Sequence, residues 1–336
     1  MKSIHRVLVA VKNPDLRRQP GLEKAIDIAR QLGASVELFH ALAAPVALET
    51  EPLSGGRSLR QLRRDRLQSC RARLEAIARE MAQAPRADGL EIEVHATWDF
   101  PPHEAIVRRA DAIHADLIIA ECHEGRRLQP WLVHLTDWEL LRLSTRPVLL
   151  LKNHIRWNKP VILAAVDPTH ARAKPAKLDA AIVEGATRLG RKLRGSVELM
   201  HANFPTGFGL LMGDPALDGA TVAKVFDLQK SAARAAFENF AADADVPKSR
   251  RHLVDADPVS GIPAVAEKLG AGLVVMGAVS RSGLKRVFVG NTAERVLASL
   301  TCDVLVLKPA RSKRRVSRKS RGMRLVPTQP LMPLPV

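Results

Sequence analysis

Short, continuous runs of valine, isoleucine and leucine recur along the chain, separated by longer stretches in which apolar and charged residues mix. Unbroken apolar runs of this length are typical of parallel strands that are covered on both faces. In the second half, the runs that we expect to be strands lie near residues 160–166, 196–202, 250–255, 272–277 and 303–308. The mixed stretches predict helices over residues 176–193, 214–244, 262–269 and 292–300. Right-handed crossovers would build this alternation into a doubly wound, five-stranded parallel sheet.

The whole pattern occurs twice. Ser35–Ala41 reads SVELFHA and Ser196–Ala202 reads SVELMHA, and three further pairs of apolar runs keep the same order with an offset of 155 to 161 residues. A period this long indicates a duplicated domain rather than a solenoid. The length of 336 residues also suits two domains of about 150 residues each. We therefore expect an α/β fold with one domain over residues 1–153 and a second over 154–310.

Positive charge concentrates in the tail that we expect over residues 311–336. The formal net charge is +17, and eight basic residues fall in the last 26 positions, where no acidic residue offsets them. The rest of the chain then carries only +9. Because the tail also ends in a proline-rich segment, we expect it to be disordered and to make weak, salt-sensitive contacts with polyanions.

Two further features of the composition concern the cellular compartment. No run approaches the roughly 18 consecutive apolar residues that span a bilayer, and no secretory cleavage site follows Met1, so we expect a cytoplasmic protein without membrane insertion. The cysteines Cys70, Cys122 and Cys302 lie far apart without a CxxC pair, which indicates reduced and mostly buried thiols.

The strongest candidate site follows the strand that ends at Gly277. Two more glycines, Gly283 and Gly290, allow tight turns and a close approach of the backbone. Asn291 can cap the next helix, with Glu294 three residues later as in a capping box. Free amides at such a helix start favour a phosphate group. Because glycine spacing alone is a weak signal, a structural loop between strand and helix is the alternative.

This stretch resembles the signature of the universal stress protein family: a glycine, two residues, a glycine, nine residues, a glycine and a small polar residue. In this chain it reads Gly277, two residues, Ser280, nine residues, Gly290 and Asn291. The strand that ends at Asp167 also resembles the family's first strand, whose terminal aspartate lies near adenine in the ATP-binding members. The resemblance covers both halves and is closest to the E-type tandem proteins.

The resemblance implies a Rossmann-like fold of the adenine nucleotide alpha hydrolase type and a role in the stress response. It also implies that ATP or a related ligand binds in the second half only. The residues that we expect around the ligand are Asp167, Ala202, Met276, Gly277, Ser280, Gly283, Gly290, Asn291 and Thr292. Ser280 replaces the second glycine of the signature, and its side chain can narrow the loop. ATP binding and a ligand-free loop therefore both stay open.

The first half has lost these anchors. The signature positions correspond there to Glu121, Glu124, His134 and Leu135, while Lys12 stands where the second half has its terminal aspartate. The presumed contact to adenine has thus reversed its charge. We expect the first domain to keep the fold without the nucleotide site.

We expect most of the other reactive side chains to be structural rather than functional. Cys122, His123 and His134 lack a fourth ligand or an orienting acid at a supporting spacing, so we predict no metal site and no catalytic residue from them. His40 and His201 end equivalent strands, where they either hydrogen-bond nearby backbone or line a pocket. The tryptophans do not alternate with basic residues, so we expect them in the core or at the domain interface; they are Trp98, Trp131, Trp138 and Trp157.

Three functions are compatible with these patterns. The first is a cytoplasmic stress-response regulator that binds ATP or a related ligand in its second domain. The second is a ligand-free interaction scaffold in which the two halves form an internal pseudo-dimer, with a further homodimer left open. The third is a nucleotide hydrolase, which we rank last because the sequence has no GxxxxGK[ST] loop and no recognisable magnesium ligand or base for fast phosphoryl transfer.

Overall fold

The computed structural model describes residues 3–42, 59–83, 89–122, 135–170, 177–204, 218–277, 291–308, 316, 317 and 319. In the first half the elements are β1 (Arg6–Ala10), α1 (Pro20–Leu32), β2 (Ser35–Leu42), α2 (Leu59–Gln83), β3 (Ile92–Trp98), α3 (Pro102–Ala112), β4 (Leu117–Glu121), α5 (Leu135–Leu143) and β5 (Val148–Leu151). In the second half they are β6 (Val161–Ala165), the short 3-10 turn η2 (Pro168–His170), α6 (Leu178–Leu193), β7 (Ser196–Ala202), α8 (Gly219–Asp243), the 3-10 turn η3 (Lys248–Arg250), β8 (Arg251–Val254), α9 (Pro258–Lys268), β9 (Ala271–Gly277), α10 (Asn291–Ser299) and β10 (Asp303–Leu307).

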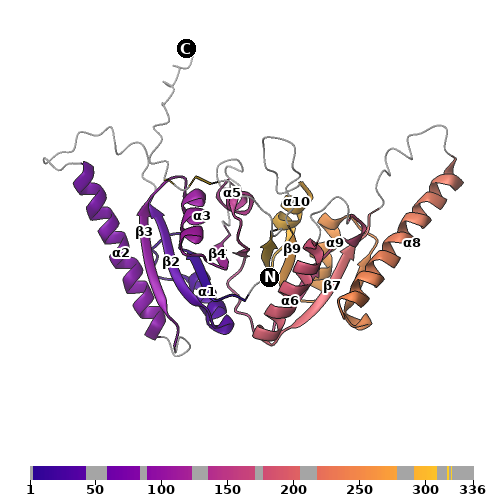
Figure 1. Ribbon diagram of the computed structural model, residues 1–336, viewed down its shortest axis with the longest axis horizontal. Helices are drawn as coiled ribbons and strands as arrows, with labels where there is room; N and C mark the ends of the chain where they lie inside the picture. Colours follow the sequence, from indigo (N-terminus) through magenta and orange to yellow (C-terminus); the bar gives the residue numbers. More distant parts are fainter. Residues whose placement is uncertain are drawn as a thin grey trace, which may run out of the picture.

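The strands form one ten-stranded sheet in the order β3-β2-β1-β4-β5-β10-β9-β6-β7-β8. Within each half all five strands are parallel, so the doubly wound, five-stranded arrangement expected from the sequence is confirmed. The halves lie side by side (Figure 1). They join edge to edge through an antiparallel pair, in which Leu149 of β5 faces Leu305 of β10. This joining of the two sheets was not predicted.

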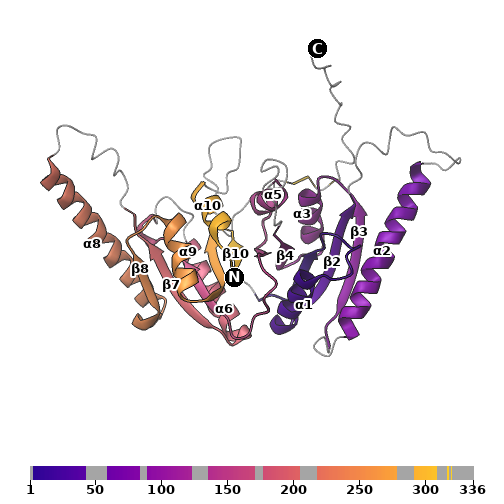
Figure 2. The same cartoon turned by 180° about the vertical axis from the view of Figure 1, so that it is seen from behind.

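Helices cover both faces of the sheet (Figure 2). Along β1, Val7 and Val9 belong to one apolar cluster and Leu8 to the other, because neighbouring side chains of a strand point to opposite faces. The first cluster includes residues of α1, α2, α6 and α8, and the second includes residues of α3, α5, α9 and α10. Each cluster contains residues from both halves, so the apolar core runs through the domain junction.

The ends of α1 show how local sequence sets the helices. Pro20 occupies the first helical position, where a backbone N–H has no partner within the helix, so the N–H that proline lacks costs no hydrogen bond. Gly33 ends the helix with a φ of 69°, a left-handed backbone conformation that residues with a Cβ rarely adopt. The same use of proline starts α9 at Pro258, four residues before the start expected from the apolar pattern.

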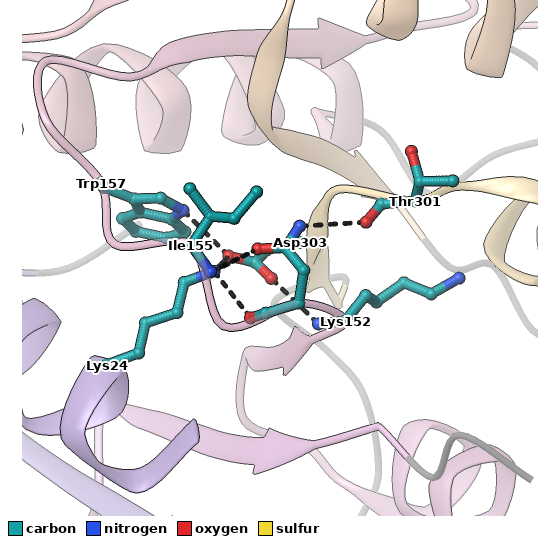
Figure 3. Close-up of polar contacts among 7 residues, drawn as sticks. Lys24, Lys152, Ile155, Trp157, Thr301 and Asp303 are labelled. Carbon is teal, nitrogen blue, oxygen red and sulfur yellow. Dashed lines mark hydrogen bonds and ion pairs between the residues drawn. The ribbon is translucent and has the colours of Figure 1, made fainter. Parts of the chain in front are cut away.

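A buried polar cluster joins the halves around Asp303, which is 0% exposed at the start of β10 (Figure 3). One carboxylate oxygen of Asp303 accepts a hydrogen bond from Nε1 of Trp157 at 2.9 Å and lies 2.5 Å from Nζ of Lys24. The other accepts the backbone N–H of Lys152 at 2.9 Å. Burial raises the pKa of the Asp303 carboxyl, and these donors compensate for the water that it has lost.

The cations of this cluster come from the first half. Lys24 lies on α1 and is 1% exposed, and its Nζ also donates to the backbone O and to Oδ1 of Asn153, at 3.0 and 2.9 Å. Nζ of Lys152 donates to the backbone oxygens of Leu297 and Leu300, at the end of α10. Burial lowers the pKa of Lys152. The first half thus supplies a lysine to a buried carboxylate and another to a helix C-terminus of the second half.

The segment between β5 and β6 (residues 152–160) and the expected tail both contribute to packing. Trp157, between β5 and β6, is 7% exposed and belongs to the first core cluster, in agreement with the expected core or interface role of a tryptophan. Of the residues in the expected tail, the structure describes three, and Val316 among them is buried in the second core cluster. Within the described part of the chain, no helix is both long and apolar enough to cross a membrane.

Candidate functional site

The candidate site lies where β6 and β9 run side by side. From β6 the chain continues to β7 and β8 on one side and then returns to β9 on the other. Such a switch point leaves a crevice outside the carboxyl ends of the two strands, where ligands of doubly wound sheets bind. Four expected contacts lie at this edge: Asp167 follows β6, Ala202 ends the neighbouring strand β7, and Met276 and Gly277 end β9. The structure therefore brings these four residues to one edge of the sheet.

Asp167 follows β6 and is partly buried. Its backbone N–H donates to Oδ1 of Asp179 at 3.2 Å, and its own Oδ1 accepts from Oγ1 of Thr169 at 2.7 Å. Asp179 lies in the first turn of α6, where a negative charge is favourable. The edge therefore presents two carboxylates, which can accept hydrogen bonds from an amino group or from hydroxyl groups. The sequence analysis did not include Asp179, although an acid just after a predicted helix start is a usable signal.

Ala202 lies at the end of β7, against the first turns of α9. A Cβ placed on Gly261 of α9 would lie 3.4 Å from the Cβ of Ala202 and 3.3 Å from Cγ2 of Val254. The next residue, Asn203, donates its backbone N–H to Val254 O at 2.8 Å and is buried. The end of β7 is thus hydrogen-bonded to the end of β8 and lies close to the first turn of α9.

Gly277 ends β9 beneath the start of α6. A Cβ on Gly277 would lie 2.7 Å from Cδ2 of Leu178 and 3.3 Å from Cδ1 of Ile182. The glycine therefore allows close packing of the strand end against the helix, whether or not a ligand binds. Met276, one residue earlier, is buried and belongs to the second core cluster.

The loop that carries the remaining anchors is mostly outside the described residues. Ser280, Gly283 and Gly290 lie there, as does the side chain of Asn291. Helix α10 begins at Asn291, and Thr292 is exposed in its first turn. The predicted phosphate contacts therefore stay predictions.

Glu294, which we expected to act in a capping box, instead binds an arginine of the first half. Oε1 of Glu294 accepts a hydrogen bond from Arg142 of α5 at 2.8 Å. The same guanidinium donates to Oε1 of Glu139, on its own helix, at 2.7 Å. Both glutamates are thus bound to one arginine, because α5 and α10 approach each other across the junction.

The first half has a different switch point, between β1 and β4. Glu121, which corresponds to Gly277, ends β4 and lies above the first turn of α1. Its carboxyl carbon is 2.7 Å from the point where a Cβ of Gly21 would stand, and its Oε1 is 2.8 Å from Nε2 of His154. The large and small side chains are therefore reversed between the two halves. In the first half the strand end has glutamate and the helix has glycine, whereas in the second half the strand end has Gly277 and the helix has Ile182.

The two strand-end histidines hydrogen-bond to nearby backbone, and of the other reactive side chains the structure describes Cys122. Nδ1 of His40 lies 2.8 Å from Val11 O, and Nδ1 of His201 lies 3.1 Å from Val166 O, so the hydrogen bonds from strand-end histidines to nearby backbone are confirmed. Burial lowers the pKa of His40, which favours its neutral form. Cys122 is partly buried after β4, and its backbone N–H donates to Leu151 O at 2.8 Å. His123 and His134 lie outside the described residues.

Metal binding has no support among the residues that the structure describes. No three His, Cys, Asp or Glu side chains come together there as ligands for an ion. The cysteines Cys70 and Cys302 are buried, and burial raises the pKa of the Cys302 thiol to about 11.

Comparisons with known proteins agree with the fold and the repeat. Residues 3–152 and 156–308 each match the sequence profile described as the universal stress protein family. The universal stress protein E of Salmonella typhi is 28% identical over 309 residues, covering 91% of this chain and 95% of that protein, and the Escherichia coli K12 protein is 28% identical over 313 residues with the same coverage.

Solved structures extend the comparison. A protein of unknown function from Pseudomonas aeruginosa PAO1 superposes with a TM-score of 0.69 at 25% identity, covering 91% of this chain and 93% of its own. A universal stress protein from Archaeoglobus fulgidus shares the fold with a TM-score of 0.59 at 16% identity, over 90% and 96% of the two chains. This chain therefore belongs to the universal stress protein family, carries two of its domains in tandem, and is similar along most of its length to the E-type proteins.

Proposed function

We propose that this protein is a cytoplasmic stress-response regulator that binds ATP or a related nucleotide in its second domain, at the crevice between β6 and β9. The observation that carries the proposal is the difference between the two switch points. The first half has the carboxylate of Glu121 above the start of α1, where it would repel a phosphate. The second half has Gly277 at the same position and Asp167 at the end of the neighbouring strand.

The base and the phosphates would then lie at opposite ends of this crevice. Asp167 and Asp179 offer acceptors for an amino group or for ribose hydroxyls, and the end of β7 at Ala202 would flank the base. The phosphates would meet the backbone amides at Gly290 and at the first turn of α10, whose dipole favours an anion. We propose binding rather than rapid turnover, because the sequence contains no P-loop and no recognisable magnesium ligand or base.

Calorimetric titration of ATP into matched variants tests this proposal. Asp167→Ala should weaken binding about tenfold through the lost hydrogen bonds, whereas Lys12→Ala at the corresponding position of the first half should leave it unchanged. Gly290→Val should abolish binding, because a branched side chain blocks the approach of the backbone. His134→Val, again in the first half, serves as its control.

Two outcomes separate this proposal from its alternatives. Ser280→Gly restores the glycine of the signature and should preserve or strengthen binding. Binding that survives Gly290→Val but is lost with His134→Val would instead assign the site to the first half. Thermal unfolding of each variant verifies that the fold is retained.

The second candidate function is a ligand-free scaffold, and the packing of Gly277 favours it. Leu178 and Ile182 lie so close to this glycine that packing alone accounts for it. Denaturing the purified protein and identifying any released small molecule by mass spectrometry distinguishes the nucleotide-binding function from the ligand-free scaffold. A nucleotide released in near-stoichiometric amount supports the first function. No released nucleotide, together with no heat on ATP titration, supports the scaffold.

A further inference from the structure

The two edge helices, α2 and α8, are equivalent in the fold but differ in charge. Each has 25 residues, and each lies along an outer side of the molecule, α2 in the first half and α8 in the second (Figure 1). Helix α2 carries seven arginines against three acidic residues, a net charge of +4. Helix α8 carries three basic and three acidic residues, so its net charge is zero. Position in the fold therefore does not account for the charge of α2.

The basic side chains of α2 are available to solvent. Its buried residues, Cys70, Leu74 and Ala78, face the sheet and belong to the first core cluster. From residue 61 to residue 69 no side chain is buried. The exposed arginines are Arg63, Arg64, Arg66, Arg71, Arg73 and Arg79. Three carboxylates on the helix cannot neutralise this set.

The arginines also follow a regular spacing. Arg64 and Arg71 are seven residues apart, as are Arg66 and Arg73, so each pair lies on one side of the helix, about two turns or 10 Å apart. Two of these arginines pair with exposed acids, Arg71 with Glu75 and Arg73 with Asp15. Exposed pairs of this kind are worth about 0–1 kcal/mol, so a phosphate can replace them at small cost.

The chemistry of α2 favours a phosphate backbone over a membrane. A helix that lies on a bilayer needs an apolar side directed to the lipid, and the apolar side of α2 is already packed on the sheet. None of the exposed large hydrophobic residues in the described part of the chain lies on α2. The guanidinium group suits phosphate oxygens, since it can donate two parallel hydrogen bonds.

Its dimensions and composition point to a duplex rather than a single strand. A 25-residue helix is about 37 Å long, close to one turn of B-form DNA. Helix α2 contains no Phe, Trp or Tyr on which unpaired bases could stack. We infer that the basic surface of α2 binds the backbone of duplex nucleic acid, without reading its sequence.

Fluorescence anisotropy with a labelled DNA duplex of about 30 base pairs tests this inference on the full-length chain. The α2 variant combines Arg64→Gln, Arg66→Gln and Arg71→Gln. The matched control combines Lys224→Gln, Lys230→Gln and Arg234→Gln, which removes the same charge from exposed positions of α8. Both proteins keep the C-terminal tail, so its contribution to binding is the same in each.

The α2 variant should bind the duplex about tenfold or more weakly, and the slope of log K against log salt should fall by up to about 3. The α8 variant should bind within about twofold of the parent. Replacing the same three arginines of α2 with lysine should retain the salt slope, because the charge is kept. Melting temperatures of all variants verify the fold.

Three results would overturn the inference. One is an α2 variant that binds like the parent, which would leave the tail as the source of binding. Another is equal weakening by both glutamine variants, which would indicate a general effect of net charge. The third is binding to phosphatidylglycerol vesicles that depends on the α2 arginines, in the absence of binding to the duplex.

Discussion

Removal of the Lys24 charge tests the buried polar cluster at the junction. In Lys24→Met the apolar stem keeps its length, and Asp303 loses an ammonium group at 2.5 Å. Breaking a buried ion pair from one side costs about 3–5 kcal/mol, because the other charge stays buried. Asp303 keeps the N–H donors of Trp157 and Lys152, so we expect the lower end of this range, about 3 kcal/mol. At an m-value near 3 kcal/mol per molar, the urea midpoint would fall by about 1 M.

Urea unfolding, followed by circular dichroism and by tryptophan fluorescence, measures this change. The matched control is Arg156→Met, which removes another cation that pairs with α1, through Glu23, at an exposed position. That variant should lose less than about 1 kcal/mol.

A double variant isolates the pair itself. Combining Lys24→Met with Asp303→Asn should cost about 2 kcal/mol less than the sum of the two single changes, because the second change removes the stranded charge. A loss in Lys24→Met no larger than in Arg156→Met, or strict additivity of the two changes, would refute the reasoning.

Three further predictions concern the halves, the thiols and the tail. The two halves, expressed separately, should each unfold cooperatively but be less stable than the whole chain, because each exposes an apolar strand edge that is paired in the full protein. Mixing the two halves should restore stability. Circular dichroism of the fragments and of the mixture measures this, and the absence of a cooperative transition would contradict it. At pH 8, alkylation followed by mass spectrometry should modify Cys122 alone in the native protein, and Cys70 and Cys302 only after unfolding, because burial raises the pKa of both of these thiols. Removing residues 320–336 should leave the melting temperature within about 1 °C, whereas a cut that also removes Val316 should lower it, since this side chain is buried in the core.

Much of the fold could be predicted because its signals are local. The unbroken apolar runs located the strands, and the recurrence of Ser35–Ala41 as Ser196–Ala202 revealed the duplication; these two segments are the matching strands β2 and β7. The equivalent histidines within them make equivalent bonds to backbone oxygens. Periodicity and repetition are sufficient for such features, since each depends on only a few neighbouring residues.

The junction could not be predicted, because it depends on residues that are remote in sequence. Nothing local in β5 or β10 indicates that the two strands pair with each other. Lys24 precedes Ile28 by four residues on the buried side of α1, which is a signal, but its partner Asp303 lies in the other half. At the candidate site, the sequence located the strand ends, whereas the contact between Glu121 and Gly21 required the packing of a strand against a helix.

The antiparallel pairing of β5 with β10 bears on how such a chain can diverge. Leu149 faces Leu305, its own counterpart in the repeat, as happens on the twofold axis of a dimer of identical subunits. In such a dimer every substitution enters the interface twice, so each residue must suit both copies of its neighbour. Here the positions that correspond to Lys24 and Asp303 are Gly185 and Pro147, so the charged pair exists once. Because the two halves are covalently fused, their interface no longer has to be self-complementary. The halves can therefore change independently, and one can lose a ligand site without the same change in the other.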